Sequence, residues 1–122
     1  MKTFKTDLIQ LASLEGYIAC SLVRFDTGEC MYKHVSPKET FNIQLTSAYY
    51  NELIKLNQKN MKTVNLDNNF SSFTLQTNKH VHIIRAIKNN PFVFIYLLIR
   101  KNEIDSGKTF KLLGTIEKKL KL

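Results

Sequence analysis

Two histidines, His80 and His82, have a spacing that could serve metal binding. Residues two apart on a strand share a face, so both imidazoles could reach one ion. Zinc sites need three or four protein ligands, and no third or fourth ligand has a supporting spacing in this sequence. We therefore assign no metal here and expect no cofactor.

Cys20 and His34 could pair as a nucleophile and its base. Both fall in a predicted hairpin that turns at residues 26–28, and His34 could face Cys20, depending on the length of the turn. A nucleophile also needs a third group that orients the base, and none is evident. We interpret the pair as packing. Cys30 would not face Cys20 across this hairpin, so we expect two reduced thiols rather than a disulfide.

Residues 106–109, Ser-Gly-Lys-Thr, carry the Gly-Lys-Thr ending of a phosphate-binding loop. Such a loop also has an earlier glycine and a preceding strand, and both are missing here. We interpret this segment as the entry to a helix. Because the other chemical motifs are also incomplete, we do not expect the chain to be an enzyme.

The chain has 122 residues, of which 43% are hydrophobic. This material suits one core rather than two, so we expect a single domain over residues 1–122. The longest apolar run, residues 92–99, is far shorter than the roughly 20 residues that a membrane-spanning helix needs. Without a span or a recognisable secretory signal, we expect a cytoplasmic location.

The formal net charge of +8 raises the question of nucleic-acid binding, because clustered Lys and Arg neutralise phosphates. The lysines are spread along the chain instead, and cations are favoured near a helix C-terminus in any case. We therefore expect no specific nucleic-acid partner and interpret the charge as a solvated basic face that favours acidic partners. The densest group falls in the predicted last helix: Lys108, Lys111, Lys118, Lys119 and Lys121.

Hydrophobic periodicity and turn signals predict an α+β (α/β) domain with the order α-β-β-α-β-β-β-α. Ser36, Pro37 and Glu39 have the spacing of a capping box at the start of the second helix. We expect a connection at residues 57–69, with a brief extended piece at 61–66. The predicted helices cover residues 3–15, 36–57 and 106–120, and the strands cover residues 17–25, 29–34, 70–77, 80–87 and 92–100.

Two of these strands, residues 17–25 and 92–99, are apolar on both alternating sets of positions. Strands of this kind belong at the centre of a sheet. If the two are neighbours, each hairpin partner lies outside them. The pattern therefore predicts a single five-stranded, mostly antiparallel sheet with the order 2-1-5-4-3 and helices on both faces.

The second predicted helix has two apolar stripes on roughly opposite sides. One sheet can cover only one stripe, so we expect a second chain against the other, where a small residue such as Ser47 permits close approach of helices. The alternative is that residues 57–69 fold over the second stripe. Glu52 falls within the wider stripe, where it could sit at the rim or meet a lysine. The wider stripe contains Phe41, Leu45, Ala48, Tyr49, Leu53 and Leu56, and the second contains Ile43, Ser47, Tyr50 and Ile54.

The outer strand at residues 70–77 lacks the usual protection of a sheet edge. Edge strands normally carry lysine, proline or a bulge that prevents pairing. Here residues 68–78 contain no charge before Lys79 and are rich in Ser, Thr and Asn. We expect this edge to be free to pair with a second copy, although a covering loop would also explain the composition.

The start of the chain resembles the opening of roadblock-family domains. The resemblance rests on residues 11–16, Leu-Ala-Ser-Leu-Glu-Gly, on residues 17–23, Tyr-Ile-Ala-Cys-Ser-Leu-Val, and on the Asp26-Thr27-Gly28 turn. As element order it covers nearly the whole chain, including residues 92–99 and the closing helix at 112–116, Leu-Leu-Gly-Thr-Ile. The resemblance implies a roadblock/profilin-like fold.

Roadblock proteins include dynein light chains and bacterial partners of Ras-like GTPases in gliding motility, and they commonly form homodimers through the second helix and the third strand. The resemblance therefore implies two partners: a second copy of this chain and a small GTPase, whose own residues the dimer rearranges. It departs from the family at Tyr49 and Tyr50, where small residues are common. The residues expected at the dimer contact are Ile43, Ser47, Tyr50, Ile54, Phe73 and Leu75.

Two other functions fit a small α+β domain. A dimeric scaffold or chaperone would hold a segment of another protein, but secretion-type chaperones tend to be acidic and this chain is basic. A ligand-sensing domain of the PAS or profilin-like kind would need an internal pocket, which a sequence cannot show. Fold alone does not decide among these functions.

Overall fold

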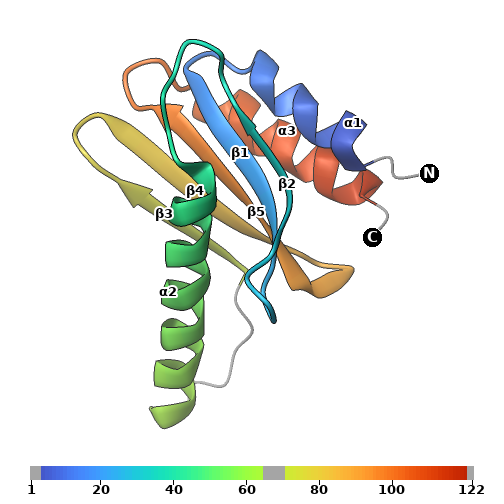
Figure 1. The fold of residues 1–122 in the computed structure, drawn as a ribbon, viewed down its shortest axis with the longest axis vertical. Coiled ribbons are helices and arrows are strands. Elements are labelled where there is room, and N and C mark those ends of the chain that lie inside the picture. The colour runs from blue at the N-terminus through green and yellow to red at the C-terminus, as the bar shows by residue number, and fades with distance from the viewer. Residues whose placement is uncertain (1–3, 65–70, 121–122) are drawn as a thin grey trace.

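A computed structural model describes residues 4–64 and 71–120. The element order is the predicted one, with the first helix ending in a 3₁₀ turn (Figure 1). The helices are α1 (Phe4–Leu8), η1 (Ile9–Ser13), α2 (Ile43–Thr63) and α3 (Ser106–Lys119), and the strands are β1 (Tyr17–Arg24), β2 (Cys30–Val35), β3 (Ser72–Gln76), β4 (His80–Ile87) and β5 (Asn90–Arg100).

The five strands form one sheet in the order β2-β1-β5-β4-β3. All four neighbouring pairs are antiparallel. The two central strands are buried along β1 up to Val23 and along β5 at residues 93–99, as expected for strands that are apolar on both faces. The predicted fold class and strand order are therefore confirmed.

The sheet is the middle layer of three. Helix α2 crosses one face, and α1, η1 and α3 cover the other (Figure 1). Two separate apolar clusters match this arrangement: one joins Leu8, Leu11, Leu113 and Ile116 to the sheet, and the other joins α2 to the opposite side of the same strands. The C-terminal turns of α2 extend beyond the end of the sheet (Figure 1), and most residues from Lys55 onward are exposed.

Helix α2 begins and ends later than the sequence predicts. Its N-cap is Asn42, whose side-chain oxygen accepts a hydrogen bond from the Leu45 amide at 3.0 Å. The predicted capping box is wrong: Ser36 and Glu39 form a turn in which the Glu39 amide bonds to the Ser36 carbonyl at 2.9 Å. The Glu39 carboxylate instead pairs with Arg100.

The C-terminal end of α2 contradicts part of the predicted connection at residues 57–69. The helix continues to Thr63, so the first half of the extended piece expected at residues 61–66 is helical. The segment at residues 65–70, which includes Phe70 of the predicted third strand, lies outside the described residues. Within the described ranges, no helix combines the length and apolar character that crossing a bilayer requires.

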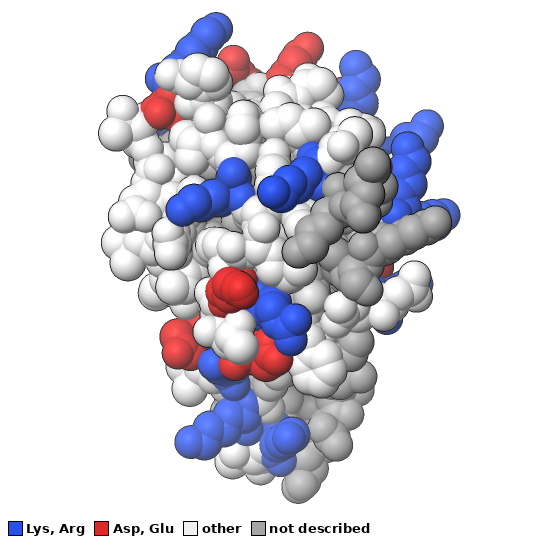
Figure 2. All heavy atoms as spheres, turned by 45° about the vertical axis from the view of Figure 1, so that its right-hand side comes forward, with Lys and Arg blue, Asp and Glu red and all other residues white. Residues whose placement is uncertain are grey.

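On the face that Figure 2 draws, charged side chains are spread out rather than gathered in one patch. Figure 2 shows Lys and Arg on several parts of one face, with Asp and Glu in small groups between them. This distribution agrees with the scattered lysines of the sequence.

Candidate interaction surface

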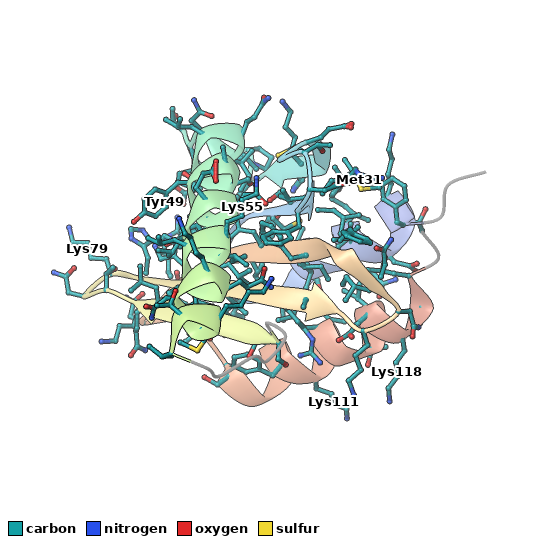
Figure 3. All side chains as sticks on the ribbon, turned by 90° about the horizontal axis from the view of Figure 1, so that it is seen from below. Met31, Tyr49, Lys55, Lys79, Lys111 and Lys118 are labelled. Atoms are coloured by element: carbon teal, nitrogen blue, oxygen red, sulfur yellow. The ribbon has the colours of Figure 1, made fainter. Side chains whose placement is uncertain are left out.

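The outer face of α2 exposes a row of large apolar side chains. Leu45, Tyr49 and Leu56 are 68%, 62% and 64% exposed, and we call these three residues the outer row. Their spacing of four and then seven residues keeps them on one side of the helix. Figure 3 shows Tyr49 projecting from the side of α2 toward which the β3–β4 turn with Lys79 also extends. A soluble chain rarely leaves such a row uncovered unless it contacts a partner.

The predicted orientation of α2 is therefore wrong. Ile43, Ser47, Tyr50 and Ile54, which we expected to face a second chain, are at most 5% exposed and lie against the chain's own sheet. The two stripes exist, but the narrower one faces inward. The wider stripe is only partly covered, because Phe41 and Leu53 pack against the core while the outer row does not.

The narrower stripe fits the sheet because its small and polar groups find partners there. The Ser47 hydroxyl lies 2.7 Å from the Ser21 hydroxyl of β1 and 2.7 Å from the Ile43 carbonyl oxygen. A serine at this position lets α2 approach β1 closely. The small residue thus serves the helix–sheet contact rather than a contact between helices.

Tyr50 lies at the centre of an aromatic cluster beneath α2. Its ring stacks on Tyr96 with centroids 5.2 Å apart and also contacts Phe73 and His82. The Tyr96 hydroxyl lies 2.8 Å from His82 Nδ1. Burial, helped by the nearby His80, lowers the pKa of His82, and burial raises the pKa of both tyrosines. These groups are therefore neutral near pH 7.

The edge of β3 adjoins α2 on the same face of the sheet. Among the described strands, β3 pairs only with β4, so its other edge is open. Phe73 and Leu75 stand opposite Ile84 and His82, which places both on the side of α2. Phe73 is half-buried and Leu75 is 40% exposed. These two predicted contact residues thus remain next to an available surface.

Glu52 lies on the exposed side of α2. It forms a long ion pair of 3.9 Å with Lys55, three residues further along the helix. Both side chains are largely exposed, so this pair contributes little to stability. Glu52 therefore meets a lysine, one of the two arrangements that the sequence allows for it, and it falls between Tyr49 and Leu56 of the outer row.

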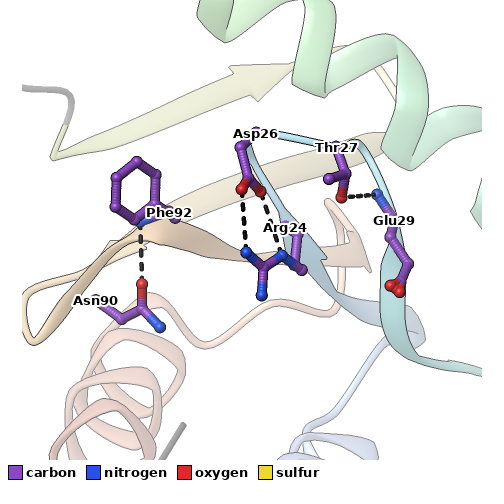
Figure 4. A network of polar contacts seen from close by, with 6 residues as sticks. All are labelled: Arg24, Asp26, Thr27, Glu29, Asn90 and Phe92. Carbon is purple, nitrogen blue, oxygen red and sulfur yellow. Dashed lines mark hydrogen bonds and ion pairs between the residues drawn. The ribbon is translucent and has the colours of Figure 1, made fainter.

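The β1–β2 hairpin is ordered by its turn. Gly28 has a φ of 78°, which favours glycine, and Arg24 forms a two-bond ion pair with Asp26 (Figure 4). The Glu29 amide donates to the Thr27 hydroxyl at 3.2 Å in the same turn. The resulting register places Cys20 opposite His34, an arrangement that the sequence left open.

Cys20 is not an activated nucleophile. The Tyr17 hydroxyl lies 2.7 Å from His34 Nδ1 and donates to the Cys20 sulfur at 3.4 Å, so a tyrosine stands between thiol and imidazole. Burial raises the pKa of Cys20 to about 11, which keeps the thiol neutral. Cys20 and Cys30 are both free thiols.

His80 and His82 do come together, with ring centroids 6.4 Å apart, but the described residues contain no group of three metal-ligating side chains. A cavity of about 490 Å³ lies where α2, β4 and β5 meet, and its wall includes Arg85 and Glu117. These two are bonded to each other at 2.7 Å, so each already has a partner, while Lys88 also lines the cavity.

Similar proteins are found by structure rather than by sequence. No protein-family model matches the chain, and no curated protein matches it. Among solved structures, MglB from Myxococcus xanthus has a TM-score of 0.79 at 9% identity, covering 95% of this chain and 89% of that one. A roadblock/LC7 domain from Streptomyces avermitilis has a TM-score of 0.73 at 11% identity, covering 97% and 92%.

A third structure, described as MglB with a tetrameric arrangement, has a TM-score of 0.77 at 9% identity and covers 93% of this chain and 82% of that one. At these identities the likeness concerns the fold. The chain therefore has the roadblock/LC7 fold, in agreement with the family resemblance of its sequence.

Proposed function

We propose that this chain is a non-catalytic interaction module that forms a homodimer and regulates a small Ras-like GTPase in the cytoplasm. The outer row of α2 is the observation that carries the dimer. Its three large apolar side chains are at least 62% exposed and lie in a line along the helix. Covering such a row with a second copy removes apolar surface from water, which drives association.

The spacing of the outer row suits an antiparallel pair of α2 helices. With the two-fold axis passing between positions 50 and 51, Leu45 of one copy lies beside Leu56 of the other. The same axis brings Tyr49 beside Glu52. A tyrosine hydroxyl can donate a hydrogen bond to a carboxylate, so this pairing gives Glu52 a second partner besides Lys55 within the apolar contact.

The open edge of β3 supports the same dimer. Two β3 edges that pair around the axis would join five strands from each copy into one sheet of ten. Leu75 lies on the side of α2 and extends the apolar contact from the helix to the strand. Both helices α2 would then lie on one face of the joined sheet.

The GTPase partner is supported by the roadblock resemblance and by the fold shared with MglB. In such a complex the dimer supplies a rigid surface that rearranges the GTPase's own residues, so no catalytic group of this chain is required. The described residues fit this role, since Cys20 is a neutral buried thiol and both His34 and His82 lie within hydrogen-bond distance of a tyrosine hydroxyl.

Light scattering tests the dimer directly. The chain mass is 14.2 kDa, and we expect about twice this value at micromolar concentration. A mass that stays at one chain up to several hundred micromolar would contradict the proposal.

The GTPase is tested with a small GTPase encoded beside the gene for this chain. We expect the immobilised chain to capture this protein more strongly in either the GTP-loaded or the GDP-loaded state. Equal failure in both states, from a chain that is dimeric in solution, would reject the GTPase partner and leave the dimer standing.

A further inference from the structure

Helix α3 presents a row of lysines on the side of the sheet opposite α2. Within this 14-residue helix, the buried positions fall on one side and the lysines on the other. Their spacing of three, seven and one residues keeps them within one exposed arc, over a length of about 16 Å. We call these four exposed residues the basic row: Lys108, Lys111, Lys118 and Lys119.

The single carboxylate of α3 is turned away from this row. Glu117 is 8% exposed, and it accepts hydrogen bonds from the Arg85 side chain at 2.7 Å and the Lys88 amide at 2.9 Å. Burial opposes its charge, but these donors outweigh burial and lower its pKa. Glu117 therefore stays ionised and inward, where it does not neutralise the basic row.

The basic row also has no carboxylate partner elsewhere in the part of the chain that the structure describes. None of its four lysines takes part in an ion pair there. Figure 3 shows Lys111 and Lys118 projecting away from the sheet, on the side opposite α2. The row is thus a line of four positive charges on an outer layer of the molecule, none of them in an ion pair among the described residues.

The four separate lysines of the basic row indicate a partner whose negative charge is spread over a flat surface. Lysine acts as a point charge, whereas specific recognition of single phosphates or carboxylates favours the two-pronged guanidinium of arginine. The three best-formed cavities among the described residues are lined by other residues than the basic row, so none of these three offers a peptide a pocket beside it. Nucleic-acid bases stack on aromatic side chains, and α3 carries one, Phe110, which is 41% exposed but lies about 100° around the helix from Lys111.

We propose that the basic row docks the protein on the surface of a membrane rich in anionic lipid. Each lysine near such a surface strengthens binding by a factor of about five. The proposed dimer would add to this effect: pairing through the β3 edges places both α3 helices on one face of the joined sheet. Both rows would then contact the same membrane, while the α2 helices point the other way.

Vesicle flotation at about 0.1 M salt tests the proposal, with vesicles of neutral phosphatidylcholine alone or with a third of phosphatidylserine. We expect the full chain to float with the anionic vesicles, to stay behind with neutral ones, and to be released by higher salt because the charges are exposed. Lys111→Gln with Lys118→Gln should weaken binding roughly 25-fold, as two factors of five.

The matched control is Lys59→Gln with Lys79→Gln, which removes the same charge from two exposed lysines outside α3. This variant should float like the wild type. An equal loss in both variants would show that net charge alone is responsible and would overturn the proposal.

Other partners give different outcomes. Tighter binding to a 20-base-pair DNA duplex than to the anionic vesicles would assign the row to nucleic acid, and loss of GTPase capture by the Lys111 and Lys118 variant without any vesicle binding would assign it to the protein partner. Either result would overturn membrane docking. A chain that is dimeric but does not float would reject this inference alone, whereas a monomer that floats would reject only the dimer.

Discussion

Tyr49 and Tyr50 meet edge to face with ring centroids 5.2 Å apart, yet they belong to different environments. Tyr50 is 3% exposed beneath α2, and Tyr49 is 62% exposed above it. One ring closes the helix against its own sheet, and the neighbouring ring begins the surface that we assign to a second copy. Tyr50 therefore stabilises the fold, whereas Tyr49 is available to a partner.

The first prediction uses these two tyrosines. Tyr50→Ala removes a ring that stacks on Tyr96, so the free energy of unfolding should fall by about 3 kcal/mol or more. Tyr49→Ala should change it by less than about 0.5 kcal/mol, when urea unfolding is measured at concentrations where the chain is monomeric. Similar losses at both positions would mean that α2 is packed differently.

The second prediction concerns the hydroxyl pair between β1 and α2. Ser47→Ala leaves the buried Ser21 hydroxyl without this partner, which should lower the free energy of unfolding by about 1–3 kcal/mol. Adding Ser21→Ala should recover much of the loss, because neither hydroxyl is then left unpaired. Additive losses in the double variant would contradict a direct bond between them.

The third prediction is a pH dependence due to His82. Its pKa is lowered in the folded chain by burial and by His80, so the unfolded chain takes up a proton first as the pH falls below about 6.5. The free energy of unfolding should therefore decrease from pH 7 toward pH 5.5. The His82→Gln variant should show a smaller decrease over this window, and an unchanged slope would reject His82 as the source.

The fourth prediction tests where α2 begins. Asn42→Ala removes the side-chain bond to the Leu45 amide and should cost about 1 kcal/mol of unfolding free energy. Ser36→Ala, at the cap that the sequence suggests, should cost less than about 0.5 kcal/mol. The reverse ranking would place the helix start at Ser36.

The fold could be predicted because its strongest signals are local. The two strands that are apolar on both faces mark the sheet centre, and the Asp26-Thr27-Gly28 turn sets the hairpin that brings Cys20 opposite His34. The start of α2 could not be predicted in the same way. Ser36 and Asn42 are both residue types that cap helices, so the sequence offers two possible starts. The ion pair of Glu39 with Arg100, which takes Glu39 away from the predicted cap, joins parts of the chain that are far apart in sequence.

The sequence predicted the wrong orientation of α2, because hydrophobic periodicity counts apolar residues without testing how their side chains pack against the sheet. The wider stripe has more apolar residues, but the narrower one has Ser47 opposite Ser21 and Tyr50 opposite Tyr96 and His82. These partners are known only once the strands are in register. The sequence identified a helix with two apolar sides, and the structure decides which side is available.

The most direct test of the interaction surface is a single charge placed in the outer row. Tyr49→Glu adds a carboxylate to an exposed position, so the chain should keep its circular dichroism spectrum but change from the dimer mass to the 14.2 kDa mass of one chain. Phe92→Glu, at a position that is 54% exposed on β5, is the matched control and should leave the dimer intact. A Tyr49→Glu variant that stays folded and dimeric in light scattering would contradict the assignment of the outer face of α2 to a second copy.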